Sequence, residues 1–210
     1  VSRWGLRGYT MLGDGGTAGG RDWGGQLDLG REQVAPDEAK ALPAWRRLRG
    51  GNQWPPSVPA MRPRMLAWMS AMEALGLDAL RALAVGLGQP IGTFDSGFVP
   101  FSDYHCKMIH YPAQPGASSS RQGVGTHHDS GLLTFILQDD VGGLQVLLDG
   151  EFVDAPPRAG CYIMNLGEMV QRATDGYLKA TPHRVLSPPA GTSRVSLAFF
   201  MNPQIGRAHV

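Results

Sequence analysis

The sequence lacks several features that mark whole classes of protein. Among its 210 residues, no apolar stretch approaches the ~20 residues that cross a bilayer, and the N-terminus lacks the basic-then-apolar pattern of a signal peptide. The formal net charge is only +1, without an extended run of lysine or arginine. We therefore expect neither a nucleic acid nor a membrane as partner, and the sequence gives no indication of an oligomeric state.

Cysteine is scarce as well. Cys106 and Cys161 form neither a CxxC pair nor a zinc-type cluster, so we expect reduced thiols in a cytoplasmic protein. Glycine and proline are abundant instead, at 29 and 16 residues, which favours strands and turns over a helical bundle. The length suits one domain with a sizeable core.

The glycine-rich segment 1–30 is expected to form irregular coil or short strands. Within it, residues 13–18 match the GxGxxA pattern of dinucleotide-binding loops. That pattern needs a helix directly after it. The pairs Gly19-Gly20 and Gly24-Gly25 follow instead, so no helix can begin there and we interpret the match as chance.

A long amphipathic helix is predicted over residues 62–87, where apolar residues recur at steps of three and four. Gly88-Gln89-Pro90 ends the pattern. We interpret its methionines as core packing rather than as a groove for a partner. The predicted buried face contains Met65, Met69, Met72, Gly76, Leu80, Leu83 and Leu87.

After residue 100 the pattern changes to short strand-like segments separated by turn signals. Asp149-Gly150 is typical of a type I′ turn and predicts a hairpin over 145–155. Strands this short and this closely spaced indicate an antiparallel barrel or jelly roll. The other predicted strands are 104–112, 131–138, 160–167, 183–188 and 193–203.

The consecutive residues His127-His128-Asp129 suggest a metal site. Alternate residues of a strand share a face, so His127 and Asp129 can converge on one ion while His128 points away. A third ligand must come from elsewhere. Of the remaining histidines His105, His110, His183 and His209, only His183 lies well downstream in a strand-like context.

Two histidines and one carboxylate form the facial triad of non-haem iron(II) oxygenases, which leaves positions open for cosubstrate and oxygen. A short His-x-Asp pattern also arises by chance. A second pattern strengthens the metal interpretation, because Arg194 and Ser196 follow His183 by eleven and thirteen residues. An arginine fork with a hydroxyl on the same strand face suits a carboxylate ligand.

The segment from about Tyr104 to Pro203 resembles the iron(II)/2-oxoglutarate-dependent dioxygenases of the isopenicillin N synthase-like family. The resemblance lies in His-x-Asp, "QDDVGGLQV", "NLGE", "TPHRV" and Arg-x-Ser. It implies a mainly β fold with flanking helices, in which a double-stranded β-helix (jelly-roll) core follows the long amphipathic helix. Earlier segments, "LRGGNQWP" among them, also resemble the region that precedes this core.

The resemblance further implies that His127, Asp129 and His183 bind Fe(II), and that Arg194 and Ser196 bind the distal carboxylate of the cosubstrate 2-oxoglutarate. Tyr111 matches the tyrosine of the family's Asn-x-Tyr segment, which contacts the cosubstrate, although Ile109 replaces the asparagine. Two milder departures are His128, where threonine is usual, and Glu168, where aspartate is usual. Asn165 is expected near the iron pocket or in a structural role.

The implied activity is oxidation of an unactivated C–H bond of a small molecule by O2, with 2-oxoglutarate converted to succinate and CO2. Hydroxylation, desaturation and ring closure are all outcomes of this chemistry. The resemblance divides the chain into a supporting region, 1–100, and a dioxygenase core, 101–204. Residues 205–210 translate a DNA string common in sequencing adapters, so we expect them to be a non-native tail in which His209 has no function.

Three other functions use parts of the same pattern. An isopenicillin N synthase-type oxidase uses Fe(II) and O2 without 2-oxoglutarate, and its Arg-x-Ser pair holds a substrate carboxylate. A zinc hydrolase can use two histidines and a carboxylate, but Arg194 and Ser196 would then be unexplained. A binding module without catalysis is expected to have lost a metal ligand, and all three are present here.

Overall fold

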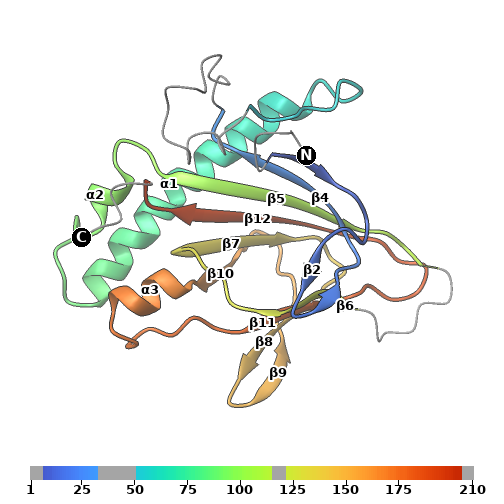
Figure 1. Ribbon diagram of the computed structural model, residues 1–210. Coiled ribbons are helices and arrows are strands. Elements are labelled where there is room, and N and C mark those ends of the chain that lie inside the picture. The colour runs from blue at the N-terminus through green and yellow to red at the C-terminus, as the bar shows by residue number, and fades with distance from the viewer. Residues whose placement is uncertain (1–6, 33–50, 115–121, 205–210) are drawn as a thin grey trace.

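A computed structural model describes residues 7–32, 51–114 and 122–204. The expected tail at 205–210 and its His209 lie outside these ranges. Within them the protein is built mainly from antiparallel strands, with one long helix and two short ones. Figure 1 shows two sheets with the long helix at the side of the larger one. This confirms the predicted class, a jelly-roll core preceded by a long helix.

The larger sheet has six strands in the order β1-β4-β5-β12-β7-β10. Its central strands β5 and β12 pair over nine residues each. Because β4 pairs with β5, the N-terminal segment belongs to the same sheet as the C-terminal half of the chain. The strands are β1 (Gly8–Thr10), β4 (Gly25–Gly30), β5 (Asp103–Tyr111), β12 (Arg194–Asn202), β7 (Leu133–Gln138) and β10 (Ile163–Leu166).

The smaller sheet has four strands in the order β6-β11-β8-β9. They are β6 (Gln122–His127), β11 (His183–Leu186), β8 (Leu144–Leu148) and β9 (Glu151–Asp154). Asp149 and Gly150 connect β8 to β9 with φ values of 49° and 87°, which confirms the predicted primed turn. The glycine-rich segment forms a separate hairpin of β2 (Gly16–Thr17) and β3 (Gly20–Arg21). Strand β4, rather than the helix that a dinucleotide-binding loop needs, comes directly after it.

Helix α1 spans Met61–Gly86, which confirms the helix predicted over 62–87. Its buried face packs with Leu133, Phe199 and Met201 of the larger sheet in one core cluster. The prediction was wrong at the end of this face, where Leu83 and Leu87 are not buried and Ala84 is. Each step of four residues shifts the buried face by about 40° around the helix axis. Two such steps, from Gly76 to Leu80 and from Leu80 onward, place Ala84 on the buried face instead of Leu83.

Several boundaries differ from the predictions for local reasons. The strand predicted over 160–167 begins only at Ile163, because Cys161 N–H donates to the Arg158 carbonyl in a turn and Gly160 has a φ of 73°. The strand predicted over 131–138 begins at Leu133. Two short helices, α2 (Asp95–Phe98) and α3 (Glu168–Ala173), were not predicted.

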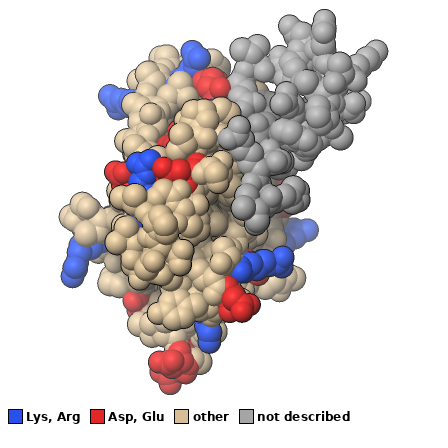
Figure 2. All heavy atoms as spheres, turned by 90° about the vertical axis from the view of Figure 1, so that its left-hand side faces the viewer, with Lys and Arg blue, Asp and Glu red and all other residues tan. Residues whose placement is uncertain are grey.

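None of the helices in the described ranges is long and apolar enough to cross a membrane. Charged side chains are spread over the surface. On the face in Figure 2, basic side chains of the described residues stand singly or beside acidic ones, without a continuous basic patch. This distribution agrees with the near-zero net charge of the sequence.

Candidate active site

A cavity of about 430 Å³ lies between the two sheets. Successive side chains of a strand point to opposite faces, so every second residue of the central strands faces this cavity. Cys106 on β5 and Phe199 on β12 lie on the opposite face of the sheet, in the core cluster with α1. The cavity walls from the two central strands include Lys107, Ile109, Tyr111, Arg194, Ser196 and Phe200.

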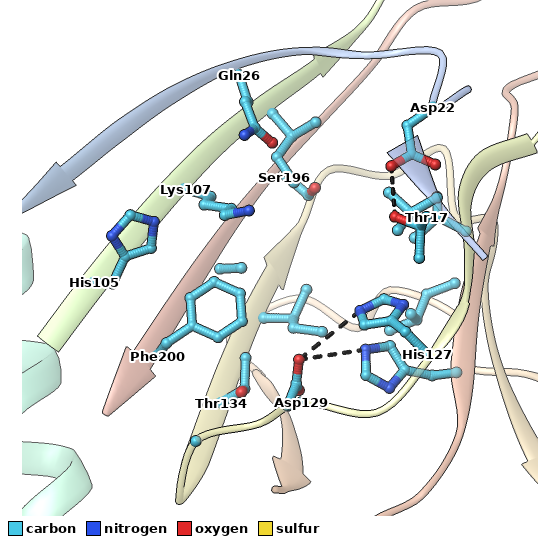
Figure 3. Close-up of a pocket in the computed structure, with 18 of the residues that line it drawn as sticks. Thr17, Asp22, Gln26, His105, Lys107, His127, Asp129, Thr134, Ser196 and Phe200 are labelled. Carbon is cyan, nitrogen blue, oxygen red and sulfur yellow. Dashed lines mark hydrogen bonds and ion pairs between the residues drawn. The ribbon is translucent and has the colours of Figure 1, made fainter. Parts of the chain in front are cut away.

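Three potential metal ligands meet at one end of this cavity, and they are the predicted ones. His127 is the last residue of β6, and His183 is the first residue of β11 and pairs with it directly. Asp129 Oδ1 lies 3.9 Å from His127 Nε2 and 3.8 Å from His183 Nε2. All three ligand atoms lie within 4.8 Å of one another, and Figure 3 shows the His127 imidazole directed at the Asp129 carboxylate.

The geometric reason given for this convergence was partly wrong. His127 and Asp129 were expected on one strand face, but β6 ends at His127 and Asp129 lies in the loop that follows. The backbone carbonyl of Asp129 accepts the Glu168 N–H at 2.8 Å, at the start of α3. A loop hydrogen-bonded to the start of α3, rather than strand alternation, therefore places the Asp129 carboxylate beside His127. His128 contributes no ligand atom, as expected for the spacer, but it lines the cavity instead of pointing away from it.

Hydrogen bonds set the tautomer of both histidines. His127 Nδ1 lies 2.8 Å from the Gly125 carbonyl, and His183 Nδ1 lies 3.1 Å from the Thr181 carbonyl. A carbonyl can only accept, so both Nδ1 atoms carry the proton and both Nε2 atoms present a lone pair. Burial lowers the pKa of the His183 imidazole, against the opposing attraction of Asp129. This lowering of the pKa by burial favours the neutral form of His183 that a metal ligand requires.

Asn165 of β10 orients the carboxylate. Its Nδ2 donates to Asp129 Oδ2 at 3.3 Å, which leaves Oδ1 facing the two imidazoles. Asp129 and Asn165 are both nearly fully buried. The sequence left open whether Asn165 lies near the iron pocket or has a structural role. The structure places it beside the ligand cluster, bonded to Asp129 across 36 residues of chain.

Arg194 and Ser196 lie on the same cavity wall, on β12. Arg194 is 1% exposed, and its guanidinium donates to Ser196 Oγ at 3.2 Å and to Gln138 Oε1 at 2.9 Å. The ring of Tyr111, its register partner on β5, lies 5.1 Å from Arg194 Cζ. The structure thus brings the three predicted anion-binding residues together, and it adds Gln138, which the sequence did not indicate.

The buried guanidinium is incompletely satisfied. Arg194 Nε makes no hydrogen bond, and no carboxylate of the described residues forms an ion pair with this side chain. Thr134 Oγ1, which also lines the cavity, is buried without a partner. Burying a cation without a counter-charge is costly, so Arg194 is suited to an anionic ligand that enters the cavity.

Asp22, which the sequence analysis did not single out, fixes the strand that ends in His127. It follows β3 directly, and its carboxylate accepts from Thr17 Oγ1 at 2.6 Å, Gln122 Nε2 at 2.8 Å and Gly125 N–H at 3.3 Å. Gln122 and Gly125 belong to β6. The hairpin β2–β3 is thereby held against the metal-ligand strand, a contact that local sequence could not indicate because about 100 residues separate the partners.

The other histidines stand apart from the ligand cluster. His105 lines the cavity, but its Nε2 bonds Asp28 Oδ1 at 2.8 Å and its Nδ1 faces Arg7 Nη1 at 3.2 Å. His110 is exposed. Within the described ranges, the only group of three or more residues with metal-ligand geometry is His127, Asp129 and His183.

Comparison with known proteins gives matches at family, sequence and structure level. Residues 102–203 match the family model for the 2OG-Fe(II) oxygenase superfamily. The chain is 35% identical to "2-oxoglutarate-dependent dioxygenase frbJ" of Dothideomycetidae sp. (strain 11243) over 92% of its length and 53% of the relative's. It is 32% identical to "Homoarginine-6-hydroxylase 2-ODD-C23" of Glycine max, over 93% of its length and 60% of the relative's.

Among solved structures, a full-length Neurospora crassa protein in complex with alpha-KG superimposes with a TM-score of 0.78 at 28% identity. The match covers 99% of this chain and 69% of that one. This chain spans roughly half of the curated relatives' length, 53% and 60% of the two described above.

Proposed function

Because the chain belongs to the 2OG-Fe(II) oxygenase superfamily, we propose that it is a non-haem Fe(II)- and 2-oxoglutarate-dependent dioxygenase. It would oxidise an unactivated C–H bond of a small molecule, by hydroxylation, desaturation or ring closure, and release succinate and CO2. One observation carries the proposal: a two-histidine, one-carboxylate cluster and a buried arginine without an anionic partner among the described residues share one cavity.

His127, Asp129 and His183 would hold the iron. Their donor set suits Fe(II), and ligation from one side leaves positions open for cosubstrate and oxygen. Both imidazoles present Nε2, because backbone carbonyls hold their Nδ1 protons. Asn165 would keep Asp129 Oδ1 directed at the ion by bonding Oδ2.

Arg194 and Ser196, with Tyr111 beside them, would bind the distal carboxylate of 2-oxoglutarate. Gln138 and Ser196 fix the plane of the guanidinium, so that little side-chain freedom remains to be lost on binding. When bound, iron with 2-oxoglutarate and O2 supplies the oxidising chemistry. The surrounding chain orients the reactants, and the apolar residues Ile136, Leu144 and Val185 keep water from the inner wall.

Finer assignments follow from the same pattern. We propose that residues 101–204 are the catalytic core, that 1–100 support it, and that the chain is isopenicillin N synthase-like within the superfamily. A cytoplasmic location is supported by the two free thiols, Cys106 and Cys161. The near-zero net charge supports a small-molecule substrate rather than a nucleic acid.

The test is anaerobic addition of Fe(II) and then 2-oxoglutarate to the purified protein, followed by visible absorption. We expect the charge-transfer band of the iron–2-oxoglutarate chelate in the parent and none in His183→Ala. A folded parent that binds iron stoichiometrically yet gives no band would point to the oxidase that works without 2-oxoglutarate. The comparisons do not favour that oxidase, since the matches described above include a 2-oxoglutarate-dependent dioxygenase and an alpha-KG complex.

A further inference from the structure

One cation of the cavity wall is not used by the proposed cosubstrate site. Lys107 lies in the middle of β5, is half-buried, and lines the cavity. Figure 3 shows its ammonium directed into the cavity, which Phe200 and Ser196 also line. Among the described residues, its ammonium has neither an ion-pair partner nor a hydrogen-bond partner.

The nearest candidate for a counter-charge is already engaged. Asp28 of β4 is the register partner of Lys107. Its carboxylate accepts from His105 Nε2 at 2.8 Å and from Gln26 Nε2 at 3.2 Å. Arg7 Nη1 donates to His105 Nδ1 at 3.2 Å, so the ring proton of His105 lies on Nε2 and points at Asp28. The polar neighbours of Lys107 therefore satisfy one another and leave its ammonium for a ligand.

Strand register separates Lys107 from the arginine end of the cavity. Arg194 pairs with Tyr111, whereas Lys107 pairs with Ala198. Four residues along β5 correspond to about 13 Å at the usual rise per residue. Between these positions the wall contains Ile109 of β5 and its register partner Ser196 of β12, and Ala198 lies opposite Lys107. A cavity of about 430 Å³ lies within the usual range for small-ligand sites, and it offers a cation at each of two separate places.

We propose that Lys107 binds a carboxylate of the primary substrate, so that the substrate class is small carboxylic acids. This inference rests on the proposed function, because it assigns the Arg194 end to 2-oxoglutarate. A single ammonium is a point charge without the fork of an arginine, and it suits a monoanionic carboxylate better than a phosphate, which usually engages several donors. The apolar side chains of Phe200 and Ile136 on the same wall would contact the hydrocarbon part of the acid.

The test compares matched acid and amide probes. Binding of 3-phenylpropionate and its amide, and of cyclohexanecarboxylate and its amide, is measured by anaerobic calorimetry on the full chain loaded with Fe(II) and 2-oxoglutarate. In the parent, each acid is expected to bind at least tenfold more tightly than its amide. Lys107→Met should abolish this preference, and Lys107→Arg should retain most of it. Lys179→Met removes the same charge at a position outside the cavity wall and should leave the preference unchanged.

Each alternative outcome has a defined meaning. Acids that bind no more tightly than amides in the parent, or equally well in Lys107→Met, would overturn the inference. A Lys107→Met variant that instead loses 2-oxoglutarate affinity would assign the lysine to the cosubstrate and also overturn it. The proposed function is tested separately, by the iron–2-oxoglutarate absorption band of the parent. The acid–amide comparison is also repeated on the protein without 2-oxoglutarate, so that failure of the substrate inference can be told apart from failure of the proposed function.

Discussion

At the scale of single residues, two adjacent histidines have different environments. His127 lies at the end of β6 with its Nδ1 held by the Gly125 carbonyl, whereas His128 lies in the loop that follows and outside the ligand cluster. Their neighbourhood in sequence does not distinguish them chemically. Their positions relative to the end of the strand differ, and of the two only His127 contributes an atom to the ligand cluster.

Alanine substitutions are expected to separate these roles. His127→Ala and His183→Ala each remove an imidazole from the cluster, so bound iron should fall from near stoichiometric to near zero. His128→Ala should keep its iron, because that ring contributes no ligand atom. Iron content after anaerobic reconstitution measures all three, and equal loss in the three variants would contradict the ligand assignment.

Arginine and lysine should differ at position 194. Arg194→Lys keeps the charge but loses the fork that Ser196 and Gln138 orient, so we expect 2-oxoglutarate to bind at least tenfold more weakly, equivalent to about 1.4 kcal/mol or more. Iron binding should be unchanged. Calorimetric titration of the iron-loaded protein measures the dissociation constant of 2-oxoglutarate. A value equal to the parent's would contradict the proposed binding of its distal carboxylate by Arg194.

The sequence reveals the residues of this site that lie close together in the chain. His-x-Asp and Arg-x-Ser are each contained in three residues. Asn165 and Gln138 reach their partners across 36 and 56 residues, so only the folded sheets bring them into contact. The motif residues at the centre of the site could therefore be predicted, whereas most of the residues that orient their side chains could not.

At the scale of elements, the long helix and the pleated strands follow from periodicity, but β6 does not. Gly123 and Gly125 give β6 little strand propensity. A Cβ at Gly123 would lie 2.9 Å from the Val185 carbonyl oxygen, and one at Gly125 would lie 2.7 Å from the Thr17 carbonyl oxygen. These glycines permit close approach of β11 and of the β2–β3 hairpin. Such contacts between distant segments are invisible in a local pattern.

Close approach also governs how α1 packs on the larger sheet. A Cβ at Gly76 would overlap Met201 Sδ of β12, which is fully buried. Gly76→Ala should therefore destabilise the protein by about 1–2 kcal/mol, because overpacking of about 1–3 kcal/mol outweighs the helix-propensity gain of up to about 1 kcal/mol. Gly86→Ala, where a Cβ meets nothing within 4 Å, should be neutral or stabilising. Urea denaturation checks both, and equal stability of the two variants would contradict this packing.

At the scale of the whole molecule, β5 connects the two halves of the chain. Cys106 at its centre pairs with Leu29 of β4 on one side and with Phe199 of β12 on the other. Its side chain is fully buried within the core cluster that includes α1. Solvent can reach this thiol only when the sheet and the helix separate, so its ionisation should report on global unfolding.

Burial raises the pKa of the Cys106 thiol to about 12 from an ordinary value of 9.0. Below pH 9 the thiol is protonated in both states, so its full contribution to stability is present. Between pH 9 and about 12 the unfolded chain releases this proton while the folded chain retains it, so the free energy of unfolding should fall as pH rises.

Urea denaturation between pH 9 and about 12 should show a steep fall in the free energy of unfolding of the parent and a shallower fall in that of Cys106→Ala. Cys161→Ala, at an exposed thiol, should keep the parent's slope, because solvent reaches that position in both states. A Cys106→Ala slope equal to the parent's would mean that β5 opens to solvent without global unfolding, and that the two halves of the chain are not one cooperative unit.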